Sequence, residues 1–183
     1  MYNNVIDSLS LVIPNASHEI EYCRVMDRWE ALETNIKPSL MRRYSDKTGS
    51  NVSYEKWLSW SDEGRVNGSM FSTNVPCTIY FLMIDNVEIT GCIIMNHDIT
   101  RRGHLHAGIV PWNRGKGYGT RMLELALVKC SEMGIDRVLI TPRNDNIGAI
   151  NTIIRNGGVL QDEFYDGDDL ILRYWIENSS PRK

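Results

Sequence analysis

Residues 110–120 read Val-Pro-Trp-Asn-Arg-Gly-Lys-Gly-Tyr-Gly-Thr, and this stretch decides the fold. An apolar, strand-like run at residues 105–110 leads into it, and an amphipathic, helix-like run follows it. Its glycines permit backbone dihedrals that a Cβ would forbid. They also leave N–H groups free at a helix N-terminus, where the helix dipole adds partial positive charge. Because Arg114 and Lys116 add formal charge, the stretch predicts an anion site for a phosphate or a pyrophosphate.

The common phosphate-binding patterns differ from this one. A Walker loop requires a glycine, four further residues and then Gly-Lys-Ser/Thr, and no window of the sequence supplies it. The dinucleotide fingerprint Gly-x-Gly-x-x-Gly fails as well, because its last position falls on Thr120 or Met122. The pattern that fits is Arg-x-x-Gly-x-Gly, formed by Arg114, Gly117 and Gly119. An ordinary tight strand-to-helix turn is the alternative interpretation.

Length and composition indicate one globular domain. The 183 residues suit a single domain, which we place at residues 1–178, followed by a short C-terminal tail at 179–183. Apolar residues make up 42% and charged residues 23%, which is ordinary globular composition. The net charge of −3 and the pI near 5.8 give no argument for nucleic acid or for an anionic membrane, and we expect neither partner. Arg42 and Arg43 are interpreted as a solvated pair.

Targeting and metal-binding signals are not found in the sequence. The N-terminus lacks the positive start and apolar run of a signal peptide. The longest apolar run, residues 77–84, is too short to span a bilayer. The four cysteines form no Cys-x-x-Cys pair and lie in mostly apolar runs, which favours buried free thiols over a zinc site or a nucleophile. We therefore expect a cytoplasmic protein that holds no metal.

The order of apolar patterns predicts a mixed α/β fold. The first half has a strand at residues 9–13 and two helices at 17–35 (capped by Ser17) and 54–60. A loop at 61–76 and three strands at 77–84, 87–95 and 103–110 follow. In the second half a helix follows the glycine loop and ends at Gly134. It is followed by a strand at residues 137–141 and by a helix at 145–156, capped by Asp145 or Asn146. Two strands come last, at 159–160 and 170–176, with an acidic turn at 162–169 between them. The central strand-helix-strand unit predicts local parallel pairing, and the whole predicts a mixed sheet with about seven strands and four helices.

This order of elements, together with two motifs, resembles the GNAT superfamily of acetyl-CoA-dependent N-acetyltransferases. Residues 103–111 resemble the family's fourth strand, whose splayed end receives the pantetheine arm, and residues 114–120 resemble its pyrophosphate loop. Residues 145–158 resemble its Asn-x-x-Ser/Ala helix, which ends in Gly-Gly. The closing residues 172–176 resemble a bacterial subgroup of predicted acetyltransferases with no settled substrate.

The resemblance implies acetyl-CoA as the cosubstrate and a set of residues that bind it. The amide groups around Ile109 and Val110 would bind the acetyl oxygen as negative charge develops there. The glycine loop would hold the diphosphate and so orient the thioester. Residues 77–158 would form the acetyl-CoA-binding core, and the helices within 16–61 would form the acceptor side. The implied cofactor-binding residues are Ile109, Val110, Arg114, Gly115, Lys116, Gly117, Tyr118, Gly119, Thr120, Asn146 and Ala149.

The acid and the base are left open by the sequence. Many relatives carry a tyrosine as the acid for the thiolate, at a position that is Ile153 here. His104 and His106 are two residues apart on one predicted strand, so they share a face and are the candidate bases. However, bases of the family usually lie at the other parity of this strand, which favours structural histidines. His97 could also serve as the base, and a water relay or an amine delivered neutral would make a base on the protein unnecessary.

Two further groups have two interpretations each. The aromatic residues at 54–60 lie where the family builds its acceptor pocket, but their spacing favours packing. The acidic residues at 162–169 could attract a cationic amine or form a solvated turn.

The leading hypothesis is an N-acetyltransferase that moves an acetyl group from acetyl-CoA to a primary amine of a small molecule or a protein, by direct attack in a ternary complex. The competing hypothesis is an acyl-CoA-binding or sensing domain that has lost catalysis, which the missing tyrosine motivates. A nucleotide-binding protein unrelated to CoA is disfavoured by the failed phosphate-loop patterns. The sequence leaves the oligomeric state open, and a homodimer is compatible with it.

Overall fold

The computed structural model describes residues 8–41, 52–68 and 75–178. Arg42, Arg43 and the predicted tail at 179–183 lie outside these residues.

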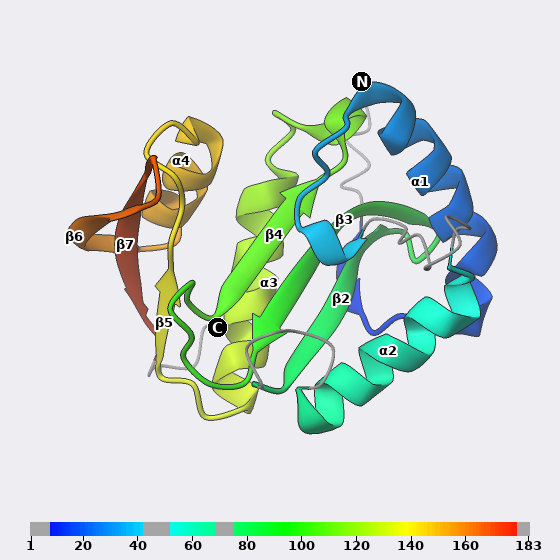
Figure 1. Ribbon diagram of the computed structural model, residues 1–183, viewed down its shortest axis with the longest axis horizontal. Helices are drawn as coiled ribbons and strands as arrows, with labels where there is room; N and C mark the ends of the chain where they lie inside the picture. The colour runs from blue at the N-terminus through cyan, green and yellow to red at the C-terminus, as the bar shows by residue number, and fades with distance from the viewer. Residues whose placement is uncertain (1–7, 42–51, 69–74, 179–183) are drawn as a thin grey trace, which may run out of the picture.

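The described part of the chain contains seven strands and four α-helices, as the sequence predicts (Figure 1). The strands are β1 (Leu9–Val12), β2 (Cys77–Ile84), β3 (Glu88–Asn96), β4 (Leu105–Ile109), β5 (Arg137–Ile140), β6 (Val159–Asp166) and β7 (Asp169–Glu177). The α-helices are α1 (Glu19–Leu32), α2 (Tyr54–Asn67), α3 (Tyr118–Glu132) and α4 (Ile147–Arg155). Short 3-10 helices are η1 (Ala16–His18), η2 (Ser39–Met41) and η3 (Pro111–Asn113).

The strands form two antiparallel sheets, with the orders β1-β2-β3-β4 and β5-β7-β6. The predicted parallel pairing is wrong for the described strands, because β5 pairs with β7 instead of β4. Backbone contacts join the two sheets near the start of β4, where the His104 N–H donates to the Leu139 carbonyl (2.8 Å) and Gly103 bridges Ile140. Beyond this point β4 has an open edge.

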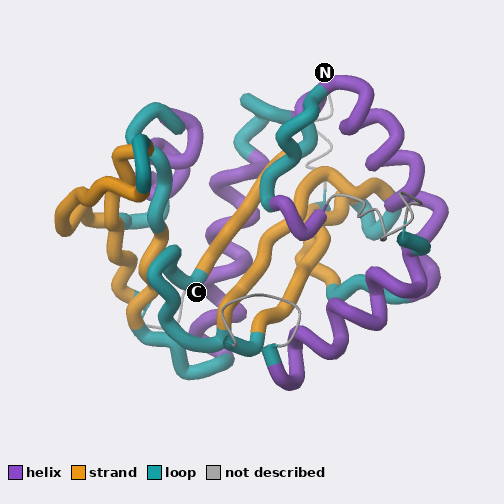
Figure 2. Tube along the Cα trace, viewed as in Figure 1, coloured by secondary structure: helices purple, strands orange, loops and turns teal. Residues whose placement is uncertain are grey.

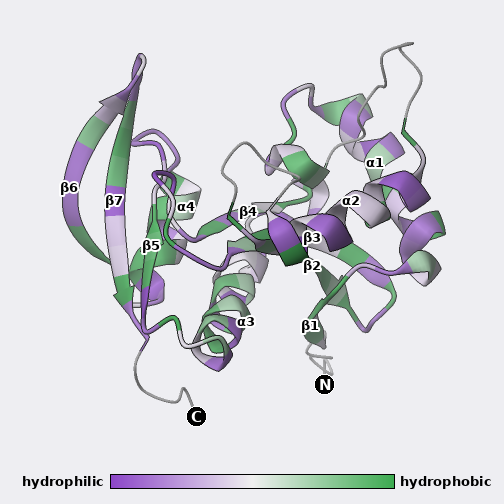
Figure 3. Ribbon diagram, turned by 60° about the horizontal axis from the view of Figure 1, so that its bottom comes forward, coloured by the Kyte–Doolittle hydropathy of each residue, from purple (hydrophilic) through white to green (hydrophobic). Residues whose placement is uncertain are grey.

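The β1–β4 sheet is covered on both faces. One hydrophobic cluster joins it to α1 and α2, with Trp29, Trp57 and Phe81 fully buried. The other joins it to α3 and to the β5–β7 sheet, with Leu82, Met95 and Leu127 fully buried. Figure 2 shows the helices on either side of the strands, and Figure 3 shows hydrophobic and hydrophilic residues alternating along α3, as in an amphipathic helix.

Helix boundaries near the N-terminus differ from the prediction. Asn15, rather than Ser17, caps the first helical segment, because its Oδ1 accepts from the Ser17 N–H (2.9 Å). Helix α2 continues through residues 61–67, where the composition predicts a loop. The reason is that Ser61 and Gly64 lie on the buried stripe of the helix, where small residues permit close packing, and Gly68 ends it in the left-handed conformation.

The predicted acidic turn at 162–169 is also shorter than expected. Strand β6 continues to Asp166, so only Gly167 and Asp168 separate it from β7. A cross-strand ion pair between Asp162 and Arg173 (2.5 Å) compensates the acidic strand residue.

The prediction of buried free thiols is confirmed for Cys77, Cys92 and Cys130, whereas Cys23 is a free thiol that is only half-buried. Burial raises the pKa of Cys77 and of Cys130 to about 12, so neither thiol is a nucleophile at neutral pH.

Candidate functional site

A cavity of about 1640 Å³ lies along the open edge of β4. Its walls come from the segment between α1 and η2, from β4, from the glycine loop and the start of α3, and from the end of β5 with α4. These elements span residues 32 to 166 of the sequence, so the cavity is formed by tertiary structure and not by one motif.

The hydrogen-bond alternation of β4 determines which amides face the cavity. The Val110 N–H donates to the Thr90 carbonyl (3.0 Å), and the Asn96 N–H donates to the His104 carbonyl (2.8 Å). The even-numbered residues of β4 therefore form the backbone hydrogen bonds to β3. Because the pattern alternates along an antiparallel ladder, the amides of Ala107 and Ile109 point to the open edge. The prediction of Val110 as a donor to a ligand is thus corrected, because its N–H is already bonded to Thr90. Ile109 is the remaining candidate donor of the two.

The glycine loop ends at the N-terminus of α3, as predicted. Gly115 and Gly117 have φ values of 78° and 85°, which favour glycine, and nothing lies within 4 Å of where their Cβ atoms would be. No side chain caps α3, and its first intrahelical bond runs from the Arg121 N–H to the Gly117 carbonyl (3.2 Å). By contrast, side chains cap α2 and α4. The first-turn amides and the helix dipole of α3 therefore offer an anion site on the cavity wall.

The two predicted cations of the loop are both engaged. Arg114 donates to both carboxylate oxygens of Glu33 (2.5 and 2.8 Å) and, through Nε, to the Ile109 carbonyl (3.0 Å). The Arg114 guanidinium and then the Trp29 indole lower the pKa of Glu33. Lys116 donates to Asn113 Oδ1 (2.6 Å). Arg114 lines the cavity, and its positive charge is paired with the Glu33 carboxylate, whereas Lys116 does not line the cavity.

The structure brings most of the predicted cofactor-binding residues together. Those that line the cavity are Ile109, Arg114, Gly115, Gly117, Gly119, Thr120, Asn146 and Ala149. Those that the cavity lining does not include are Val110, Lys116 and Tyr118. Asn146 caps α4, because its Oδ1 accepts from the Ala149 N–H (3.1 Å). Ile153 lines the cavity but is almost fully buried.

The predicted bases separate into structural and cavity-lining histidines. Whereas His106 lines the cavity, His104 does not. Its Nδ1 accepts from the Leu139 N–H (3.0 Å), and the buried ring does not line the cavity. His97 likewise bonds Thr78 (2.8 Å) away from the cavity.

His106 lines the cavity, with Nε2 3.4 Å from Asn96 Nδ2. Burial, and then the nearby Arg102 charge, lower the pKa of His106 to about 4. The ring is therefore neutral at pH 7 and is a weak base.

Tyr54 and Trp57 of α2 pack in the core, as their spacing favours, whereas Trp60 is half-buried outside it. Core contacts of this kind position one wall of the cavity. The Trp57 indole donates to the Leu40 carbonyl (2.8 Å), and the Tyr22 hydroxyl donates to the Met41 carbonyl (2.9 Å). These bonds hold residues 33–41 against β4. Gly108 permits the contact, because a Cβ there would lie 1.9 Å from the Lys37 carbonyl oxygen.

Several cavity residues were not predicted from sequence. They include Glu33, Asn96, Thr100, Arg101, Arg102, Thr141 and Thr152. Arg101 and Arg102 belong to the polar connection between β3 and β4, and their pairing with Asp166 joins segments 64 residues apart. In the sequence, the only signal for a site at this position is the pair of adjacent positive charges at Arg101 and Arg102.

In the described residues, no helix is long and apolar enough to cross a membrane, and no group of three or more His, Cys, Asp or Glu side chains is placed to hold a metal ion.

Comparisons with known proteins agree with this architecture. A model of the acetyltransferase (GNAT) family matches residues 34–157. No curated protein matches the chain significantly.

Similar solved structures include the microcin C7 self-immunity acetyltransferase MccE, in complex with acetyl-CoA and AMP (14% identity, 93% of each chain, TM-score 0.65). Another is a chimera of the Vibrio cholerae spermidine N-acetyltransferase SpeG and hSSAT (13% identity, 93% of this chain and 96% of that one, TM-score 0.61). A third is the Salmonella typhimurium acetyltransferase that modifies the N-terminal serine of ribosomal protein L7/L12 (16% identity, 93% and 95%, TM-score 0.62). At these identities the likeness establishes the fold.

Proposed function

The chain belongs to the acetyltransferase (GNAT) family, and from this premise we propose that it transfers the acetyl group of acetyl-CoA to a primary amine by direct attack in a ternary complex. The observation that carries the proposal is one continuous cavity that joins the uncapped N-terminus of α3 to the outward-facing amide of Ile109. An anion site and a carbonyl-binding amide are the two features that a CoA thioester requires.

The diphosphate would bind the first-turn amides of α3 beside Gly117 and Gly119. A side chain at Gly117 would adopt a strained φ, so the loop keeps the amides accessible. The pantetheine arm would run along the open edge of β4, where outward backbone groups can pair with its own amide groups. At the thioester, the Ile109 N–H would donate to the acetyl oxygen and stabilise the developing negative charge.

Direct attack needs no protein nucleophile. In the described part of the cavity wall there is no cysteine and no tyrosine, and the acid position of many relatives is Ile153. Because neutral His106 has a lowered pKa, it is suited to accept a hydrogen bond from the amine and orient it, rather than to hold a proton at pH 7. The N–C bond would form as the C–S bond breaks, and the amine's proton would pass through water to the departing CoA thiolate.

Thermal unfolding with acetyl-CoA, CoA, ATP and NAD tests the binding step. A ligand at about 100 times its dissociation constant stabilises by roughly 2.7 kcal/mol, or about 5–10 °C for a domain of this size. We expect a shift with the two CoA species and none with ATP or NAD. A larger shift with ATP would contradict the proposal.

Thiol release from acetyl-CoA over a panel of amines tests the chemistry. Amine-dependent release supports transfer. The burial of Ile153 in place of a tyrosine favours a second candidate, an acyl-CoA sensor, and CoA binding without turnover for any amine would select it. The small-molecule or protein nature of the acceptor and a homodimer remain predictions from the sequence, as does the division into an acceptor side and a CoA-binding core.

A further inference from the structure

The cavity carries an excess of positive charge, although the whole chain has a net charge of −3. Within the described residues, six cationic side chains and two carboxylates line it. The cations are Lys37, Arg101, Arg102, Arg114, Arg143 and Arg155, of which Arg143 is paired with Asp145 and Asp169 (2.9 Å each). The carboxylates are Glu33 and Asp166. Both are already engaged with arginines, Glu33 with Arg114 and Asp166 with the pair at 101–102.

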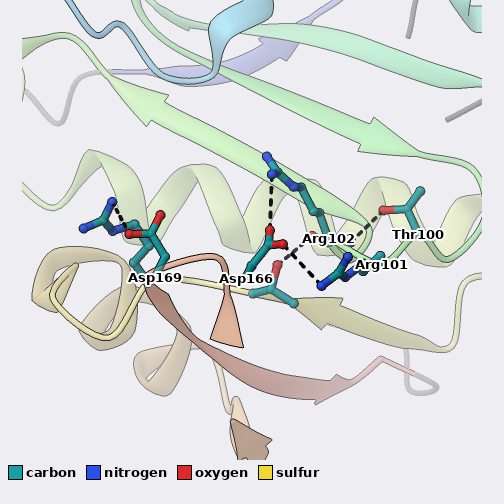
Figure 4. A network of polar contacts seen from close by, with 7 residues as sticks. Thr100, Arg101, Arg102, Asp166 and Asp169 are labelled. Carbon is teal, nitrogen blue, oxygen red and sulfur yellow. Dashed lines mark hydrogen bonds and ion pairs between the residues drawn. The ribbon is translucent and has the colours of Figure 1, made fainter. Parts of the chain in front are cut away.

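Two arginines share one carboxylate at the start of β4. Arg101 and Arg102 reach the two oxygens of Asp166 at 3.2 and 3.3 Å, and Figure 4 shows Asp166 between their side chains. Their side chains are 71% and 75% exposed. Each guanidinium carries five N–H donors, so single contacts at these distances leave donors for another anion. The cluster has a net positive charge.

The backbone of this arginine pair is held in place. The Thr100 hydroxyl accepts from the Arg102 N–H (3.2 Å) and donates to the Gly103 carbonyl (2.7 Å). From the end of β5, the Thr141 hydroxyl donates to the Arg102 carbonyl (2.8 Å). The pair therefore belongs to a built wall of the cavity and not to a free loop.

The arginine pair lies at the end of β4 opposite the glycine loop. Arg102 precedes Leu105, the first residue of β4, and the loop follows Ile109, the last. Five strand residues span about 15 Å, which separates this cluster from the diphosphate site within one cavity. The Arg102 charge acts on His106, so the cluster lies beside the part of β4 that an acceptor would approach.

We propose that the acceptor amine carries an anionic group, a carboxylate or a phosphate, which binds Arg101 and Arg102 in place of the Asp166 carboxylate. The inference rests on the proposed function. Paired guanidinium groups match the oxygens of both anions. A polyamine would instead require free carboxylates, and the described cavity wall offers none.

Matched acceptors test the inference. O-phosphoethanolamine is compared with ethanolamine, and β-alanine with β-alaninamide, with spermidine as the polycation. Binding to the protein saturated with CoA is measured by calorimetry, and turnover is measured by thiol release from acetyl-CoA. We expect the anionic member of each pair to bind about 10–100-fold more tightly, as charge-assisted hydrogen bonds predict. Preference for spermidine or for the uncharged members would overturn the inference.

Three variants separate recognition from a merely structural ion pair. Arg102→Gln should weaken binding of the anionic acceptors by about 10–100-fold and leave the KM for acetyl-CoA unchanged. Asp166→Asn should strengthen binding of the anionic acceptors, because the competing carboxylate is removed. If the ion pair were merely structural, both substitutions would change acceptor binding in the same direction. Arg137→Gln is the matched control, since Arg137 pairs with Glu177 outside the cavity lining. A raised KM for acetyl-CoA in Arg102→Gln would assign the pair to the cofactor and refute the proposal.

The two readouts distinguish the two failures. Turnover of neutral amines without binding of the anionic ones contradicts the anionic acceptor and leaves acetyl transfer standing. Binding of the anionic acceptors without turnover supports the anion site and contradicts the proposed transfer. If the anionic acceptors do not bind and no amine is turned over, both the anionic acceptor and the proposed acetyl transfer are contradicted.

Discussion

His106 should make the stability of the protein depend on pH. Burial lowers its pKa in the folded protein to about 4, from the ordinary value of 6.5. The unfolded chain therefore binds the proton first as the pH falls. The stabilising contribution is complete above pH 6.5 and is lost between about pH 6.5 and pH 4. At about 1.4 kcal/mol per pH unit, the loss amounts to about 3 kcal/mol.

Urea unfolding of wild type and of His106→Gln at pH 7, 6, 5 and 4 measures this loss. His18, His97 and His104 also have lowered pKa values because they are partly or largely buried. They are common to both proteins, so the difference between the two free energies of unfolding isolates His106. We expect that difference to fall by about 3 kcal/mol from pH 7 to pH 4.

A difference that stays constant within about 0.5 kcal/mol would refute the reasoning. It would mean that the ring is hydrated or paired in a way that keeps its ordinary pKa. The same measurement bears on catalysis, because a ring with a pKa of about 4 cannot cause an inflection in the pH–rate profile near pH 6.5.

Three substitutions test the site itself. Gly117→Glu should abolish stabilisation by acetyl-CoA, because it fills the anion site and opposes the diphosphate charge; normal CoA affinity with unchanged circular dichroism would remove the site from this loop. Gly108→Ala should destabilise by about 1–3 kcal/mol, or roughly 3–10 °C in Tm, because its Cβ would lie 1.9 Å from the Lys37 carbonyl oxygen; an unchanged Tm would show that the 33–40 segment can shift without cost. Ile109→Pro removes an amide that makes no bond to β3, so kcat should fall about 10²–10³-fold with the KM for acetyl-CoA retained. Val110→Pro is its control, because it removes a ladder bond and should lower Tm instead; equal kcat for wild type and Ile109→Pro would exclude that amide as the donor.

The parts of the fold that depend on local chemistry were predictable. Glycines with positive φ mark the turn before α3, and Asp85 and Asn86, also at positive φ, form the predicted hairpin turn between β2 and β3. The apolar runs that became β2 and β3 need no distant partner to be recognised as strands. For the same reason, the glycine loop and the start of α3 could be placed from eleven consecutive residues.

The parts that depend on distant partners were not predictable. Whether β5 pairs with β4 or with β7 is decided by packing, so the parallel pairing was predicted wrongly. The polarity of β6 suggested a turn because the Arg173 side chain that compensates Asp162 comes from another strand. The 33–40 wall reaches the site only because Gly108 lacks a Cβ. These contacts have no signal in the local sequence.

Net charge was a poor guide to the ligand for the same reason. The overall charge of −3 describes solubility and long-range attraction, while the cavity concentrates arginines from four separate segments. At each end of the cavity a carboxylate of the protein forms ion pairs with arginines: Glu33 with Arg114 at one end, and Asp166 with Arg101 and Arg102 at the other. Those carboxylates hold the arginines in place before any ligand arrives, at the cost of competition with the ligand's own anion. On the two proposals above, this arrangement of charge would serve an anion at each end of one cavity, the diphosphate at one end and the acceptor's anionic group at the other.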